Sequence, residues 1–222
     1  MNDLEEIDLY FCFPGRNYYS EAMVAWANTV QYLISNKISY RFNFAYTPML
    51  QHTRNLLIGI NPETYDGTIP TKPFGGKYKP KKVIMIDDDI VWTVEDIKKI
   101  IESDKDIIAG FYWSEIENKV VAEFIDNPGN KIEAHELNNL NDLVELNQSG
   151  FGFVAIKFEI FEKMNFPWFE NFYIKNTETN QFDVVGEDVY FSVKARHLGY
   201  KTYGDPTIRL KHMKKMGFEI PK

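Results

Sequence analysis

Short apolar runs alternate with helical repeats over the first half of the chain. Apolar stretches at 7–13, 38–46, 83–86 and 106–111 predict strands. Between them, apolar residues recur every three or four positions over 23–34, 50–60 and 94–101, which predicts amphipathic helices. Thr93 and Asp96 have the spacing of a capping box at the start of the third helix. Strands that alternate with helices predict an α/β fold with a largely parallel sheet.

The second half has a mixed pattern. Residues 120–125 and 131–136 flank an Asn-Pro-Gly-Asn turn and predict a β-hairpin. A strand over 150–157 and a helix over 158–164 follow, and 165–185 is aromatic and irregular. A helix then begins at Gly186 and ends at Gly199, and a last strand is expected over 201–203. We expect one domain over residues 1–222, built as a three-layer sandwich with a mostly parallel central sheet and a small antiparallel addition.

Residues 61–82 are rich in proline and glycine and predict a long loop. Five lysines gather at its end, namely Lys72, Lys77, Lys79, Lys81 and Lys82. One interpretation is a contact with an anionic partner, such as a diphosphate or an anionic acceptor. The other is a solvated excursion without a ligand.

Composition narrows the class of protein. The chain has 222 residues, of which 44% are hydrophobic, which suits a globular domain with a sizeable core. Its net charge of -7 argues against nucleic acid as a partner, since phosphate binding needs a basic surface. No apolar run approaches the roughly 18 residues of a membrane span, and the N-terminus is acidic rather than a signal peptide. The single cysteine, Cys12, favours a reducing compartment, so we expect a cytoplasmic protein.

The main candidate for chemistry is the acidic triplet Asp87, Asp88 and Asp89, which directly follows the apolar run at 83–86. Ligands in open α/β sheets bind at the carboxyl ends of the strands. Adjacent carboxylates that also meet phosphates are typical of Mg²⁺ or Mn²⁺ sites. The triplet therefore favours a metal-bridged phosphate site. The alternative is an acidic turn with no ligand.

Three further motifs accompany the triplet. Glu187 and Asp188 follow Gly186 at a predicted helix start, where the helix dipole favours negative charge. Arg54-Asn55 lies on the second predicted helix, and Gly150-Phe151-Gly152 begins a predicted strand, where glycine can indicate close approach of a ligand. Taken singly, these motifs are explained as well by a helix cap, a solvated helix face and a turn.

Together with Pro14 at the end of the first strand and a late His212, these motifs follow an order that resembles the GT-A fold nucleotide-diphospho-sugar glycosyltransferases, in a family-2-like arrangement. The resemblance covers roughly residues 7–212. It implies a metal-dependent glycosyltransferase, with hexosyl transfer favoured, that moves a sugar from a UDP- or GDP-sugar to a glycan, lipid-linked or other acceptor hydroxyl. The implied cofactor is Mn²⁺ or Mg²⁺.

The resemblance also implies roles for individual residues. Asp87 and Asp89 match the two acids of the Asp-x-Asp motif, which hold the metal and contact the ribose, and Asp88 is the middle residue beside them. His212 would supply a further metal ligand. Asp188, with Glu187 beside it, would face the acceptor as general base. The nucleotide and sugar would be bordered by Pro14, Gly15, Arg16, Arg54, Asn55, Gly150, Phe151 and Gly152.

Two rival functions stay open from the sequence. Asp87 to Val91 also fits the Asp-x-Asp-x-Val motif of haloacid-dehalogenase-like phosphohydrolases, in which Asp87 would be the nucleophile. The other rival is a non-catalytic relative that binds nucleotide or metal without turnover.

We also expect the tail beyond residue 205, which contains His212, to become ordered only when metal and nucleotide are bound.

Overall fold

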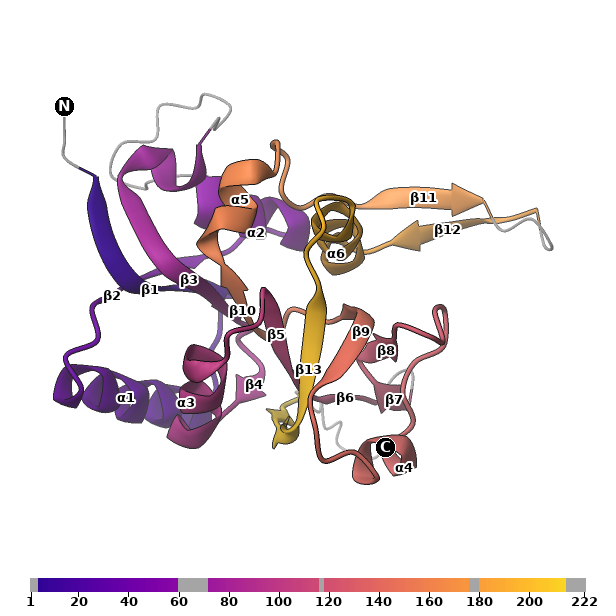
Figure 1. The fold of residues 1–222 in the computed structure, drawn as a ribbon, viewed down its shortest axis with the longest axis horizontal. Helices are drawn as coiled ribbons and strands as arrows, with labels where there is room; N and C mark the ends of the chain where they lie inside the picture. Colours follow the sequence, from indigo (N-terminus) through magenta and orange to yellow (C-terminus); the bar gives the residue numbers. More distant parts are fainter. Residues whose placement is uncertain (1–3, 60–71, 116–117, 176–179, 215–222) are drawn as a thin grey trace, which may run out of the picture.

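The computed structural model describes residues 4–59, 72–115, 118–175 and 180–214. Its centre is an eight-stranded sheet in the order β2-β1-β3-β10-β5-β13-β9-β8 (Figure 1). In chain order these strands are β1 (Glu5–Pro14), β2 (Tyr40–Ala45), β3 (Tyr78–Ile86), β5 (Ile107–Phe111), β8 (Ala122–Phe124), β9 (Val144–Ser149), β10 (Phe153–Lys157) and β13 (Thr202–Arg209).

Most strands of this sheet run in one direction. β1 is parallel to β2 and β3, and β13 is parallel to β5. Only β10 and β9 are antiparallel to both neighbours, so the other strands all share one orientation. The expected mostly parallel sheet is therefore confirmed, and the carboxyl ends of β1 and β3 lie side by side at one edge.

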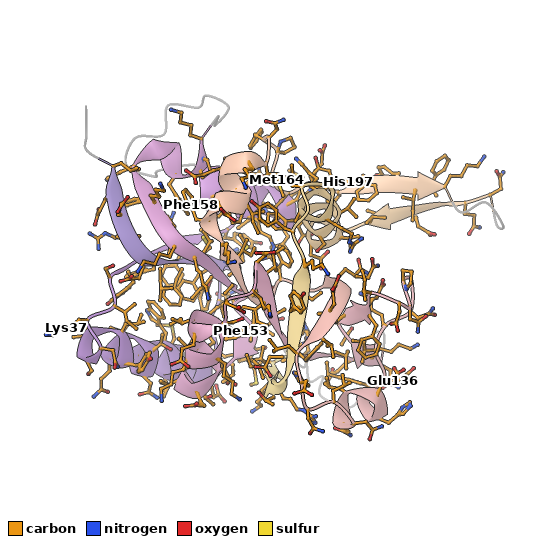
Figure 2. All side chains as sticks on the ribbon, in the orientation of Figure 1. Lys37, Glu136, Phe153, Phe158, Met164 and His197 are labelled. Atoms are coloured by element: carbon orange, nitrogen blue, oxygen red, sulfur yellow. The ribbon has the colours of Figure 1, made fainter. Side chains whose placement is uncertain are left out.

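Helices cover both faces and complete three layers. One face carries α2 (Leu50–Gly59), α5 (Phe158–Lys163) and α6 (Glu187–His197), and the other carries α1 (Ser20–Ser35) and α3 (Val94–Glu102) (Figure 1). Side chains alternate along the strands, so Tyr10 and Cys12 pack on the first face while Phe11 and Phe13 pack on the second. Figure 2 shows the side chains on the ribbon, with Phe153 labelled near the middle of the sheet.

Smaller elements surround the sheet. Three two-stranded ladders join β4 (Ile90–Val91) to β14 (Lys211–His212), β6 (Trp113–Ser114) to β7 (Lys119–Val120), and β11 (Phe172–Lys175) to β12 (Phe182–Val185). The last of these extends away from the body (Figure 1). A 3₁₀ turn, η1 (Pro73–Gly76), and a short helix, α4 (Ala134–Asn138), complete the list of elements.

Several predicted element boundaries are confirmed. α3 begins with a complete capping box in which Thr93 and Asp96 exchange hydrogen bonds. α6 ends before Gly199, whose φ of +88° is the left-handed conformation expected of a C-terminal glycine.

Among the described residues, none of the helices combines the length and apolarity needed to cross a bilayer.

The predicted hairpin over 120–136 is wrong in its second arm. Residues 134–138 form α4, and Lys131 makes only an isolated bridge to Glu123. β8 pairs instead with β9, a strand that the alternation did not predict. A short segment of helical residues beside a proline-glycine turn is compatible with either structure, so tertiary pairing decides.

The lysine-rich loop is also wrong over the part that the structure describes. Residues 61–71 lie outside the described residues, but β3 already begins at Tyr78. Lys81 forms an ion pair with Asp8 at 2.7 Å. The half-buried Lys82 ammonium donates to the carbonyl oxygens of Ile100 and Ile101 at the end of α3. Because these two lysines have partners within the protein, they are not available for the expected contact with an anionic partner.

The other differences concern irregular regions. β10 begins at Phe153, so Gly150 to Gly152 form the turn before it. The stretch at 165–185 contains β11 and β12. The last strand, β13, continues to Arg209, beyond the predicted end at 203, and β14 follows. The expected ligand-dependent ordering beyond residue 205 stays a prediction.

Candidate functional site

The acidic triplet lies at the carboxyl end of β3, next to the carboxyl end of β1. The last four residues of β3 are fully buried, which fixes the strand between β1 and β10. The Asp87 amide donates to the Gly152 carbonyl at 3.0 Å, and the Ile90 amide donates to the Asp87 carbonyl at 3.2 Å. The chain therefore turns tightly after the strand, and its three carboxylates project in different directions.

The Asp87 carboxylate is held by Arg54 from α2. Nη2 of Arg54 donates to both carboxylate oxygens, at 2.9 and 3.2 Å. Burial raises the pKa of Asp87 to about 7, although the guanidinium acts in the opposite direction. Asp87 thus lies in a partly buried position, with the Arg54 guanidinium as its neighbouring cation.

The same arginine reaches the second acidic segment. Nε of Arg54 donates to Glu187 at 3.1 Å, and Nη1 donates to the Phe151 carbonyl at 3.2 Å. The Arg54 side chain is only 2% exposed. Burial disfavours its charge, but Asp87 and Glu187 compensate and keep its pKa above the ordinary value. Arg54 therefore fixes the acidic triplet against the start of α6.

The Asp88 carboxylate contacts a different segment from those of Asp87 and Asp89. Its Oδ2 accepts the backbone amides of Arg16 at 2.9 Å and Asn17 at 3.2 Å. Gly15 approaches so closely that a Cβ there would lie 2.3 Å from the Asp88 Cβ. The Arg16 guanidinium lies over the Tyr46 ring, 5.6 Å from its centroid. Asp88 thus shapes the loop after Pro14, where β1 ends.

Asp89 and His212 lie together, because β14 pairs with β4 directly after the triplet. Nε2 of His212 is 3.1 Å from Oδ2 of Asp89, and Nδ1 is 2.6 Å from the Trp113 carbonyl. Burial alone would raise the pKa of Asp89, but His212 and Lys214 outweigh it and lower that pKa. The hydrogen bond to Asp89 raises the pKa of His212.

The orientation of His212 suits a metal ligand. A carbonyl only accepts hydrogen bonds, so Nδ1 donates to Trp113. In the imidazolium form Nε2 donates to the Asp89 carboxylate, and in the neutral ring Nε2 would offer its lone pair to a metal ion. Two ligands about 2.1 Å from one ion are separated by roughly 3 Å at a right angle, which matches the spacing of Nε2 and Asp89 Oδ2. Lys214 Nζ also donates to this oxygen, at 2.7 Å. Over the residues described, no set of three or more acidic, histidine or cysteine side chains is arranged as a metal cluster.

The Glu187-Asp188 pair begins α6, on the other side of Arg54. Oδ1 of Asp188 accepts the Val189 amide at 2.8 Å, inside the first turn of the helix. Burial and then the charge of Glu187 raise the pKa of Asp188. A carboxylate with a raised pKa is better suited than an ordinary one to receive a proton.

Two further candidate residues, Asn55 and Phe151, are buried. Asn55 accepts the amides of Trp168 and Phe169 and donates to the carbonyls of Gln51 and Phe169, so its amide is fully engaged. Phe151 is buried beneath the Arg54 guanidinium.

Residues that the sequence did not single out complete the site. Tyr112 lies against Gly150, Gly152 and His212, Trp113 orients the histidine, and Lys214 reaches Asp89. These contacts depend on pairings of two-residue strands, which leave no periodic signal in the sequence.

Neither protein-family models nor curated protein sequences match the chain. Solved structures do. The protein A197 from STIV is 16% identical, with a TM-score of 0.53 over 97% of this chain and 99% of that one. The catalytic domain of Drosophila beta1,4galactosyltransferase 7, in complex with xylobiose, is 12% identical, with a TM-score of 0.51 over 94% of this chain and 71% of that one.

GalNAc-T7, solved with UDP, GalNAc and Mn²⁺, is 9% identical, with a TM-score of 0.53 over 95% of this chain. The match spans 44% of that protein. At these identities the likeness concerns the fold alone. It confirms the architecture that the motif order predicted: the chain has the GT-A fold of glycosyltransferase catalytic domains.

Proposed function

We propose that this protein is a metal-dependent glycosyltransferase that moves a sugar from a nucleoside-diphosphate sugar to an acceptor hydroxyl. The observation that carries the proposal is that Arg54 joins Asp87, at the carboxyl end of β3, to Glu187, beside Asp188, while Asp89 lies 3.1 Å from His212. Structural neighbours that were solved with UDP and Mn²⁺, or with manganese, UDP-Gal and xylobiose, support it. A UDP- or GDP-sugar is the donor class that we propose.

Asp89 and His212 would hold Mn²⁺ or Mg²⁺, with Asp87 beside them in the buried network of Arg54. When bound, the ion would neutralise charge on the diphosphate leaving group. The loop from Pro14 to Arg16, anchored by Asp88, would border the nucleotide. Arg54 and Asn55 would support the site from below rather than contact the donor, because their polar atoms already have protein partners.

In the proposed reaction, the acceptor oxygen forms a bond to the anomeric carbon as the bond from that carbon to the diphosphate oxygen breaks. The bonding electron pair leaves with the diphosphate, and the acceptor proton passes to the Asp188 carboxylate. Glu187, fixed by Arg54 at 3.1 Å, would hold the start of α6 in register with the donor. Direct displacement of this kind inverts the configuration at the anomeric carbon.

The phosphohydrolase alternative is less consistent with the geometry. Its nucleophile would be Asp87, but both oxygens of that carboxylate accept hydrogen bonds from Arg54. Burial also raises the pKa of Asp87 to about 7, which reduces the fraction of anion available for attack.

The test is release of nucleoside diphosphate from UDP- and GDP-sugars in the presence of Mn²⁺, with water or an added glycan as acceptor. Asp188→Asn should slow release by about 10²- to 10⁴-fold, the usual contribution of a general base, while donor affinity is retained. Asp104→Asn, an exposed carboxylate away from the site, is the matched control. Donor binding without turnover in the wild type would favour the non-catalytic alternative, and unchanged release in Asp188→Asn would remove the base.

A further inference from the structure

Tyr112 lies between β5 and β6, at the centre of the site. Its hydroxyl oxygen accepts the Gly152 amide at 3.2 Å, and the Gly152 carbonyl accepts the Asp87 amide at 3.0 Å. The Tyr112 hydroxyl is thus fixed one peptide unit away from the acidic triplet.

Two glycines make this position possible. A Cβ on Gly150 would lie 2.0 Å from the Tyr112 hydroxyl oxygen, and one on Gly152 would lie 2.8 Å from Cζ of the ring. Any side chain at either residue would displace the tyrosine. The glycine pair therefore accommodates Tyr112. From the sequence we expect the backbone of these glycines to border the sugar, and in the structure the Tyr112 side chain lies against them instead.

The ring and the hydroxyl face different parts of the site. The ring meets His212 edge-on, with centroids 5.2 Å apart. A tyrosine hydroxyl, with an ordinary pKa of about 10, is protonated at neutral pH. A tyrosine hydroxyl has one proton to donate. Across the described parts of the chain, the only hydrogen bond of the Tyr112 hydroxyl is the one that it accepts from Gly152, and the backbone carbonyl of Tyr112 accepts the Val121 amide.

We propose that Tyr112 donates its hydroxyl proton to an oxygen of the transferred sugar and so recognises the sugar of the donor. The inference rests on the proposed function. In that function the sugar lies between the diphosphate, bound near Asp89 and His212, and the acceptor, bound near Asp188. Tyr112 contacts His212 through its ring, and its hydroxyl lies at Gly152, whose carbonyl accepts the Asp87 amide, so we place its O–H beside the sugar.

The experiment compares nucleotides with sugar nucleotides by calorimetry in the presence of Mn²⁺. The panel contains UDP, GDP, ADP and dTDP, each paired with its common hexose conjugates. Tyr112→Phe keeps the ring against the glycines and His212 and removes only the hydroxyl. It should weaken sugar-nucleotide binding by roughly 3- to 10-fold, as expected for one neutral hydrogen bond, and leave binding of the free nucleotide unchanged. Tyr203→Phe, a partly buried tyrosine on β13 outside the site, is the control.

Three results would contradict the inference, and each is distinct. Equal affinities of Tyr112→Phe and wild type for sugar nucleotides would show that the hydroxyl makes no contact with the sugar. An equal loss for nucleotide and sugar nucleotide would assign Tyr112 to the support of His212 instead. If wild type binds none of the panel while both proteins are folded by thermal unfolding, the proposed function itself fails.

Discussion

Replacement of Arg54 by methionine should destabilise the protein strongly, because its buried guanidinium compensates the partly buried Asp87 carboxylate and the largely buried Glu187 carboxylate. Its N–H groups reach Asp87 at 2.9 and 3.2 Å and Glu187 at 3.1 Å. Methionine fills similar volume but leaves both acids without their cation. Removal of one member of a buried ion pair costs about 3–5 kcal/mol, which is a large part of the roughly 5–15 kcal/mol that stabilises a domain.

The assay is urea unfolding followed by tryptophan fluorescence. Arg54→Lys keeps the charge but lacks the fork that spans two acids, so we expect a smaller loss of about 1.5–3 kcal/mol, the value of one hydrogen bond to a charged group. Arg41→Met is the control, because Arg41 forms an exposed ion pair with Glu5, and such pairs contribute about 0.2–1 kcal/mol. A loss in Arg54→Met no greater than in Arg41→Met would refute the argument that Arg54 holds the two acidic segments together.

Two further substitutions test other parts of the account. Gly15→Ala should weaken nucleotide affinity, because its Cβ would displace Asp88, which anchors the loop after β1. Asp88→Ala removes the same anchor. Calorimetry of the double variant should therefore show little more loss of affinity than either single variant. Asp8→Asn tests acid stability, because hydrogen bonds from Lys81 and Ser39 lower the pKa of Asp8 to about 2 in the folded state, below the unfolded value of about 3.9. The stability that the wild type gains from this carboxylate should be fully present above pH 4 and lost as pH falls toward 2. The unfolding free energies of wild type and variant should therefore converge at low pH. A difference between them that does not change with pH would contradict the assignment.

Much of the fold could be predicted because the burial pattern is regular. β3 is an apolar run buried on both faces, and α3 carries a complete capping box. The start of β3 was missed because residues 78–81 pair only with β1. Among the described residues no strand pairs with its other edge there, and an unpaired edge tolerates Pro80 and exposed lysines within a strand.

The candidate site was predictable in its residues but not in their connections. The motif order indicated Asp87, Asp89, Asp188 and His212. Arg54 was taken as a donor contact, whereas the structure buries it between two carboxylates. Such a bridge joins residues 133 positions apart and leaves no local signal. The tautomer of His212 likewise depends on the Trp113 carbonyl, which spacing alone does not reveal.

The central claim is that Asp89 and His212 hold a divalent ion together with a nucleoside diphosphate. Calorimetric titration of Mn²⁺ into protein saturated with UDP or GDP tests it most directly. We expect metal binding in the wild type, a loss of at least about 10-fold in affinity for Asp89→Asn and for His212→Ala, within the range known for altered metal sites, and wild-type affinity for the control His135→Ala. Wild-type Mn²⁺ affinity in both site variants, with the fold intact by circular dichroism, would contradict the account.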